Sequence, residues 1–243
     1  MKTAVVTGAS SGIGEATARL LAAEGYRVIC AARRFDRIQS LADEIGGEAV
    51  ACDVTEPASV ERLADAVGDS LDVLVNNAGG ALGLEPVASA DLDAWETMIQ
   101  TNLLGTARVT KALLPSLMQA QGVIVFVTST AADSGYEGGA GYCAAKAGER
   151  SVVEALRLEL FDQPVRVTEI CPGMVRTDEF ALTRFGGDRA RADAVYDGVA
   201  EPLTAEDVAD AIVWMATRPA HVNIDRLTIR PRAQAAQHKV DRR

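Results

Sequence analysis

Tyr142 and Lys146 are two side chains whose types and spacing indicate acid–base chemistry. They lie four positions apart in the stretch SGYEGGAGYCAAKAGE, so on a helix they share one face, one turn apart. A tyrosine ordinarily titrates near pH ~10, and an adjacent ammonium group stabilises the phenolate and lowers that pKa. A tyrosine tuned in this way could exchange a proton with a reacting oxygen. By spacing alone, however, such a pair is more typical of a surface contact, so other motifs must decide between the two interpretations.

A glycine-rich turn near the N-terminus predicts a binding site for a pyrophosphate. Residues 7–14 read TGASSGIG, with Gly8, Gly12 and Gly14 directly after an apolar segment. Glycines let the backbone approach the phosphates, whose charge is favoured at the N-terminus of the following helix. The spacing is G-x-x-x-G-x-G rather than the commoner G-x-G-x-x-G. Its location at the first strand–helix junction indicates a dinucleotide site.

The end of the second apolar segment favours NADP over NAD. NAD-binding proteins usually carry a carboxylate there that accepts hydrogen bonds from the ribose 2′-hydroxyl. Here the segment reads CAARRFDR, with Ala32 at that position and Arg33 and Arg34 directly after it. Guanidinium groups bind a 2′-phosphate in a forked geometry, whereas a carboxylate would repel it. The alternatives are that both arginines are solvated residues at a helix start, and that Asp36 reaches a ribose rather than lying in the first helical turn.

Short apolar segments alternate with helical patterns along the whole chain. This alternation predicts an α/β fold, a single-domain doubly wound (Rossmann) parallel sheet of about seven strands over residues 1–243. The predicted strands are 3–7, 26–32, 48–54, 71–76, 122–129, 165–172 and 226–231. The predicted helices are 12–25, 35–46, 57–68, about 91–119, about 142–161, and 205–217.

Two segments depart from this alternation. Residues 173 to about 203 form a connection too long for an ordinary loop, which predicts a lid or binding-loop insertion. The polar and basic tail after Pro231 is expected either to be frayed or to dock on a neighbouring subunit.

Composition restricts the partners of the protein. The net charge of −10 argues against broad binding to nucleic acid or to anionic membranes. The four cysteines form no C-x-x-C pair, and the two histidines both lie near the C-terminus, so we expect no metal centre and a reducing compartment. No apolar run approaches the ~20 residues that span a bilayer, and no signal segment opens the chain. We therefore expect a cytoplasmic protein with a small-molecule substrate, no nucleic-acid partner and no membrane association.

Taken together, the motifs resemble the short-chain dehydrogenase/reductase family over essentially the whole chain. The matching motifs are TGASSGIG (7–14), Asp53-Val54, NNAG (76–79), Asn102 in QTNLLGT, Ser129 in FVTST, Tyr142-x-x-x-Lys146 and PGMVRT (172–177).

The resemblance implies roles for the polar residues. Tyr142 would exchange a proton with the substrate oxygen, and Lys146 would bind the nicotinamide ribose and assist Tyr142. Ser129, thirteen residues before Tyr142, would hydrogen-bond the substrate oxygen, and Asn102 would hold a water of the proton relay. The cofactor would contact Gly8, Ser10, Ser11, Gly12, Ile13, Gly14, Arg33, Arg34, Asp53, Val54, Asn76, Ala78, Gly79, Tyr142, Lys146, Pro172, Gly173, Val175 and Thr177.

Three segments, two of them in the C-terminal third, are similar to a narrower group, the NADP-dependent 3-hydroxy acid dehydrogenases of the serine and allo-threonine type. The segments that carry this similarity are NNAGGALGLEP, EFALTRFGGD and LTAEDVADAIVWMATRPAHVNIDRLTIRP. It implies a small β-hydroxy acid substrate at Ser129 and Tyr142, with Arg184 or Arg176 as the cation for its carboxylate. Alternatives are a broader NADPH-dependent aldehyde or ketone reductase, a β-ketoacyl carrier-protein reductase, and a catalytically inactive NADP-binding sensor. The family also implies a homotetramer built on the helices near 91–119 and 142–161.

Overall fold

The predicted parallel sheet is present. In the computed structural model, which describes residues 1–243, seven parallel strands form one sheet in the order β3-β2-β1-β4-β5-β6-β7. The strands are β1 (Thr3–Thr7), β2 (Arg27–Ala32), β3 (Glu48–Ala51), β4 (Val73–Asn76), β5 (Val123–Val127), β6 (Arg166–Pro172) and β7 (Arg226–Ile229). The order reverses between β1 and β4, and in such sheets this is where ligands bind, beyond the carboxyl ends of the strands.

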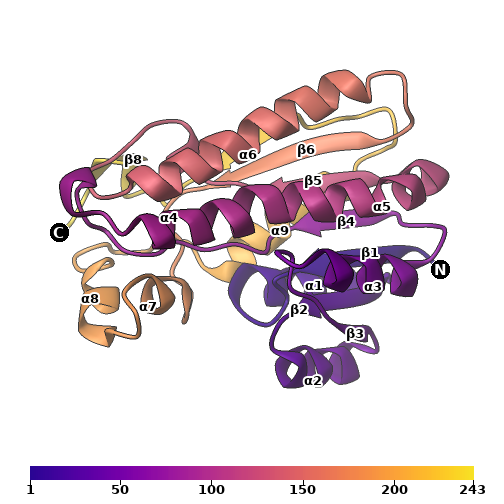
Figure 1. The fold of residues 1–243 in the computed structure, drawn as a ribbon, viewed down its shortest axis with the longest axis horizontal. Coiled ribbons are helices and arrows are strands. Elements are labelled where there is room, and N and C mark those ends of the chain that lie inside the picture. Colours follow the sequence, from indigo (N-terminus) through magenta and orange to yellow (C-terminus); the bar gives the residue numbers. More distant parts are fainter.

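Helices cover both faces of this sheet (Figure 1). The helices are α1 (Gly12–Ala23), α2 (Phe35–Ile45), α3 (Pro57–Val67), α4 (Leu92–Ile99), α5 (Thr106–Ala120), α6 (Ala140–Glu159), α7 (Phe180–Arg184), α8 (Arg189–Ala194) and α9 (Ala205–Ala216). One core lies between the sheet and α1, α2 and α9, and the other lies between the sheet and α3, α5 and α6. Neighbouring strand residues belong to opposite cores, as Val5 and Val6 do, which explains why the strands read as continuous apolar runs.

The helix expected over 91–119 is interrupted by a π-helical turn. Asp91 starts α4 by accepting hydrogen bonds from the backbone N–H groups of Asp93 and Ala94 (3.0 and 3.2 Å). Residues 100–105 then form the π-helical turn η2 before α5 begins. Such turns often occur at functional sites, and this one contains Asn102.

The long insertion after β6 folds back on itself. Its two ends pair, because the N–H of Arg176 donates to the carbonyl of Leu203 (2.7 Å) and the N–H of Leu203 donates to Met174 (3.1 Å). Between them lie α7 and α8, which share a small apolar cluster centred on Tyr196. Both short helices lie at the end of the molecule away from the N-terminus (Figure 1).

The C-terminal tail folds on its own chain, so the alternative of a frayed tail is wrong, whereas docking on a neighbouring subunit stays a prediction. It forms an antiparallel hairpin of β8 (Gln234–Ala236) and β9 (Lys239–Val240). The side chain of Gln234 accepts a hydrogen bond from the N–H of Met174 (2.7 Å), and Arg242 donates to the carbonyls of Val195 and Asp197 (3.0 and 2.6 Å). These contacts satisfy backbone groups of the insertion, which no local sequence pattern reveals. No helix is both long and apolar enough to span a bilayer.

The buried side chain of Phe126 tests this core. It is fully buried in β5 against α3, α5 and α6. We expect Phe126→Ala to lower the free energy of unfolding by about 3–5 kcal/mol, because it removes apolar contacts and leaves a cavity. The matched control is Phe161→Ala, whose side chain is 85% exposed and which we expect to change stability by less than about 0.5 kcal/mol. Chemical denaturation measures both, and equal losses in the two variants would contradict this core.

Candidate active site

The glycine-rich turn brings two chain segments into backbone contact. Gly8 and Gly12 adopt positive φ angles of 67° and 54°, which side chains disfavour. A Cβ on Gly14 would lie 2.4 Å from the carbonyl oxygen of Gly8. The hydroxyl of Thr7 accepts hydrogen bonds from the N–H groups of Asn77 and Ala78 (both 3.0 Å), which fixes the turn against the end of β4.

A cavity of about 540 Å³ opens at the carboxyl ends of the strands. It joins this turn to the ends of β2, β4, β5 and β6, the start of α6, the insertion and the C-terminal hairpin. The predicted site residues that line it are Gly8, Ser10, Ser11, Gly12, Ile13, Arg33, Arg34, Asp53, Val54, Ala78, Gly79, Ser129, Tyr142, Lys146, Pro172, Gly173, Val175, Thr177 and Arg184. Four predicted site residues, Gly14, Asn76, Asn102 and Arg176, lie outside the cavity lining.

Asn76 lies beneath the site rather than in its wall. Its side chain is 2% exposed and donates to the hydroxyl of Thr110 (2.9 Å). The next residue, Asn77, lines the cavity and donates from its side chain to the carbonyl of Thr7 (2.9 Å). Successive residues of a strand point to opposite faces, so the NNAG motif alone does not reveal which asparagine faces the site.

Asn102 braces the cavity wall from behind. Its side chain is fully buried, and its amide donates to the carbonyls of Met98 (2.8 Å) and Gly80 (3.0 Å). Its side-chain oxygen accepts from the N–H of Gly80 (3.0 Å). A Cβ on Gly79 would lie 2.4 Å from that oxygen, so the wall segment and Asn102 are closely packed.

Ser129, Tyr142 and Lys146 converge on the cavity from two elements. Ser129 follows β5 and accepts a hydrogen bond at its Oγ from the N–H of Ala131 (3.1 Å). Tyr142, in the first turn of α6, makes no hydrogen bond within the protein. Its ring packs in a T-shaped arrangement with the ring of Phe180, with the two ring centres 6.0 Å apart. Lys146 is buried, and its Nζ donates to the carbonyl of Val127 (3.0 Å) and to Glu149 (2.7 Å).

Glu149 is a buried partner of Lys146 that the motifs did not single out. Burial raises the pKa of Glu149 to about 7, although the charge of Lys146 opposes this shift. Burial alone would lower the pKa of Lys146, but the charges of Glu149 and Tyr142 outweigh it and raise that pKa. The available signal was the helical spacing, because positions i and i+3 share a face.

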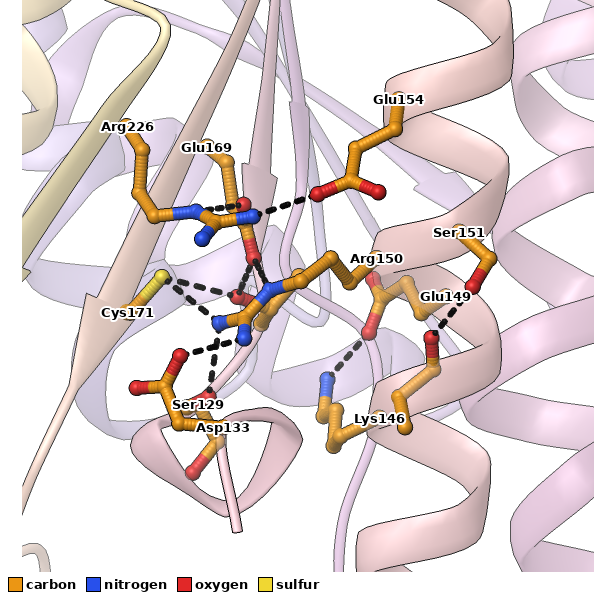
Figure 2. Close-up of polar contacts among 12 residues, drawn as sticks. Ser129, Asp133, Lys146, Glu149, Arg150, Ser151, Glu154, Glu169, Cys171 and Arg226 are labelled. Carbon is orange, nitrogen blue, oxygen red and sulfur yellow. Dashed lines mark hydrogen bonds and ion pairs between the residues drawn. The ribbon is translucent and has the colours of Figure 1, made fainter.

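The same end of α6 carries a second buried ion pair (Figure 2). Arg150 donates to Glu169 of β6 (2.8 Å), whose other oxygen accepts from Arg226 (2.8 Å). Burial would raise the pKa of Glu169, but hydrogen bonds from Thr128, Arg150 and Arg226 hold it below its usual value. Arg150 also pairs with Asp133 and lies 3.5 Å from the carbonyl oxygen of Ser129, so the cluster borders the site.

The two arginines after β2 lie exposed at the far end of the cavity. Arg34 donates to the hydroxyls of Ser10 (2.8 Å) and Ser11 (3.0 Å) and forms an ion pair with Glu179 of the insertion (2.7 Å). Arg33 helps to lower the pKa of Asp53, against the effect of burial and alongside hydrogen bonds from Thr55.

Asp36 lies in the first turn of α2 and outside the cavity lining, as its position in the sequence indicated. Ala32 is the strand-end residue, so no carboxylate side chain stands at that position.

Of the two arginines predicted to bind a substrate carboxylate, only Arg184 lines the cavity. It donates to the carbonyl of Gly83 (2.9 Å) and has its guanidinium 5.6 Å from the ring centre of Tyr136. Arg176 instead lies over the ring of Tyr196, at 5.2 Å from its centre.

The C-terminal hairpin adds two amides to the cavity. Gln234 and Gln237 line the cavity, and the oxygen of Gln237 accepts from the hydroxyl of Thr130 (2.8 Å). The sequence carries no signal for them, because more than a hundred residues separate Gln237 from Thr130.

Comparisons with known proteins agree with this geometry. The family pattern of the short chain dehydrogenases matches residues 2–184. An uncharacterized oxidoreductase of Mycobacterium tuberculosis is 59% identical over 236 residues, covering 97% of this chain and 93% of that protein. An NADP-dependent 3-hydroxy acid dehydrogenase of Salmonella typhi is 42% identical, covering 95% of each chain. The closed form of a serine dehydrogenase complexed with NADP⁺ is 41% identical and superposes with a TM-score of 0.92 over 96% of each chain. The chain therefore belongs to the short-chain dehydrogenase family and is an oxidoreductase that acts on CH–OH groups.

Proposed function

We propose that the protein transfers a hydride between NADP(H) and a small 3-hydroxy acid of the serine type, with Tyr142 as the acid–base group. The observation that carries this proposal is the single cavity that joins the glycine-rich turn to Ser129, Tyr142 and Lys146. The similarity to a serine dehydrogenase complexed with NADP⁺ and to an NADP-dependent 3-hydroxy acid dehydrogenase supports the cofactor and the substrate class.

The residues at the phosphate end fit NADP. Gly14 lets α1 start close against the backbone of Gly8, where a side chain would collide, and the N-terminus of α1 would favour the charge of a pyrophosphate. Arg33 and Arg34 would hold the 2′-phosphate, since the strand end lacks the carboxylate that NAD would need. Asp53 and Val54 would contact the adenine, Ala78 and Gly79 would line the dinucleotide, and Thr177 would contact the carboxamide.

At the reacting end, the protein has to orient the substrate and manage one proton, because the bound nicotinamide supplies the hydride chemistry. Ser129 would donate a hydrogen bond to the substrate oxygen, and Tyr142 would take its proton during oxidation or return it during reduction. Lys146 would bind the ribose and favour the ionised form of the tyrosine. Asn102 would hold the water that extends the relay while its side chain braces Gly80.

Arg184 is the proposed partner of the substrate carboxylate. It is the cation of the insertion that reaches the cavity, whereas Arg176 lies over Tyr196. The runner-up function, a broader NADPH-dependent aldehyde or ketone reductase, needs no such cation. A catalytically inactive sensor is less favoured, because Tyr142 and Lys146 are both retained. A panel of small 3-hydroxy acids, serine, and neutral alcohols with NADP⁺ discriminates between these functions.

Assembly and location remain predictions, the assembly from the family and the location from the sequence composition. We expect a homotetramer in the cytoplasm, and light scattering of the purified protein measures the assembly.

Substitution of Tyr142 tests the acid–base role. We expect Tyr142→Phe to lower kcat by about 10²–10⁴-fold, the usual contribution of a positioned proton-transfer group. NADPH binding, followed by the fluorescence of the nicotinamide, should stay unchanged. The control is Tyr26→Phe, which lies outside the cavity and should keep both properties. Near-wild-type turnover in Tyr142→Phe would reject the mechanism.

Substitution of Arg33 tests the choice of cofactor. We expect Arg33→Ala to lower the preference for NADP⁺ over NAD⁺ in kcat/KM by about tenfold or more, the value of one charge-assisted hydrogen bond. Arg62→Ala, on the exposed face of α3, serves as the control. An unchanged preference in the Arg33 variant would exclude its contact with the 2′-phosphate.

Substitution of Arg184 tests the substrate class. We expect Arg184→Met to raise the KM for a 3-hydroxy acid about tenfold or more, because a carboxylate loses its cation. The KM for a neutral alcohol should change little. Arg189→Met, exposed on α8 and outside the cavity lining, is the control. Equal effects on acidic and neutral substrates would remove Arg184 as the carboxylate site.

A further inference from the structure

Glu149 is buried directly behind Lys146 and outside the cavity lining. Its side chain is 1% exposed, and one oxygen accepts the hydrogen bond from Nζ of Lys146 at 2.7 Å. The ammonium therefore lies between two oxygens of the protein, this carboxylate and the carbonyl of Val127 (3.0 Å), while Lys146 itself lines the cavity.

Packing does not require a carboxylate at this position. A buried carboxylate is costly unless it is paired, and an apolar side chain would fill the inner face of a helix at lower cost. The two buried carboxylates also differ in their partners. Glu169 receives hydrogen bonds from Thr128, Arg150 and Arg226, whereas the one cation that contacts Glu149 is Lys146. The charge of Glu149 is thus directed at the lysine of the active site.

We propose that Glu149 is a positioning residue that acts through Lys146: it fixes the ammonium group at the cavity wall and offsets its charge, and thereby sets the pH range over which Tyr142 exchanges its proton. This inference rests on the proposed acid–base role of Tyr142.

The sign of the effect follows from electrostatics. A positive charge near a phenol favours the phenolate, and a carboxylate 2.7 Å behind that charge weakens its field at the phenol. Burial strengthens both effects, because water screens the charges poorly there. A neutral residue at position 149 therefore leaves the site one unit more positive, so that Tyr142 gives up its proton at lower pH.

The pH range of this effect follows from the carboxylate itself. Burial raises the pKa of Glu149 to about 7, so it carries its full negative charge only above neutrality. We therefore expect wild type and a neutral variant to differ most above about pH 7 and to converge below it.

The other charged groups near Lys146 and Glu149 remain the same in wild type and in a variant with a neutral residue at position 149. The titratable side chains that act on the pair are Tyr142 of α6 and Glu169 of β6. Glu169 in turn contacts Arg150, whose other neighbours are Asp133 after η3 and Cys171 of β6. Arg150 is paired with Glu169 and Asp133, and burial raises the pKa of the Cys171 thiol, which keeps it neutral. The turn η2 contributes Asn102 and α5 contributes Thr106, both uncharged, and the acidic residues of α4, Asp93 and Glu96, are exposed.

The experiment compares wild type with Glu149→Gln, which keeps a hydrogen-bond acceptor for Lys146 and removes the charge. The first readout is the pH profile of kcat/KM for alcohol oxidation with NADP⁺. The second needs neither substrate nor cofactor: it is the phenolate absorbance of the free protein during alkaline titration, with the Tyr142→Phe trace subtracted. In Glu149→Gln we expect the rising limb of the profile and the absorbance change to move to lower pH by about one pH unit.

Three further variants make the result specific. Glu149→Asp retains the charge and should return both curves toward wild type. Glu149→Met removes the charge without a polar group, and it should shift the curves in the same direction if Glu149→Gln folds poorly. Glu159→Gln, the same change at the exposed end of α6, should leave both curves in place.

Unchanged curves together with a lower melting temperature would reduce Glu149 to a structural residue and overturn the proposal. A shift to higher pH would also overturn it, because Glu149 would then act mainly by keeping Lys146 protonated. If wild type oxidises no substrate of the panel, the proposed function fails, yet the absorbance titration still decides the inference about Glu149.

Discussion

The burial of four charges under the active-site end of α6 constrains the rest of the structure. Lys146, Glu149, Arg150 and Glu169 are the buried charged side chains of the chain, and they form two ion pairs whose charges sum to zero. Removing one member of a buried pair commonly costs about 3–5 kcal/mol, because the partner is left uncompensated. Arg150 holds α6 at a fixed position against β6 through Glu169, and the hydrogen bond from Lys146 to the carbonyl of Val127 holds it against β5. That position brings Tyr142 and Lys146 to the cavity and sets Arg150 beside the carbonyl of Ser129.

A second constraint is the close contact between the segment after β1 and the segment after β4, where the strand order reverses. The side chain of Asn77 and the backbone of Ala78 contact the glycine-rich turn, which fixes the N-terminus of α1 beside the end of β4. All seven strands are parallel, so their carboxyl ends meet at one edge of the sheet. The glycine-rich turn and the start of α6 are thus held at a fixed separation by the same sheet. Each of the two regions tolerates little change: a Cβ on Gly14 would collide with the carbonyl of Gly8, and the charge of Glu149 is paired with Lys146.

Local patterns in the sequence predicted the features that depend on neighbouring residues, namely the strands and the glycine-rich turn. The seven strands follow from apolar runs and the turn from its glycines, whereas the convergence of Ser129 with Tyr142 was implied by the family resemblance. Contacts between distant segments were not predictable in this way. The choice between Asn76 and Asn77, the hairpin that brings Gln237 to Thr130, and the partner of Arg184 all depend on tertiary packing. Glu149 is intermediate, because its spacing from Lys146 was visible but its burial was not.

The two parts of the site also differ in how firmly they are held. Ser129 directly follows the end of β5, and Tyr142 and Lys146 stand on α6, two elements that are packed into the large cores, while Tyr142 itself belongs to a smaller buried cluster. Arg184, Gln234 and Gln237 come instead from the insertion and the tail, which have a small cluster of their own and hydrogen-bond one another through Gln234 and Arg242. Rigid elements suit proton transfer, where distances of about 3 Å decide the rate. Loops can change without disturbing that geometry. Under the proposed function, substitutions in the insertion and the tail could therefore change the choice of substrate and leave the proton chemistry of Tyr142 intact.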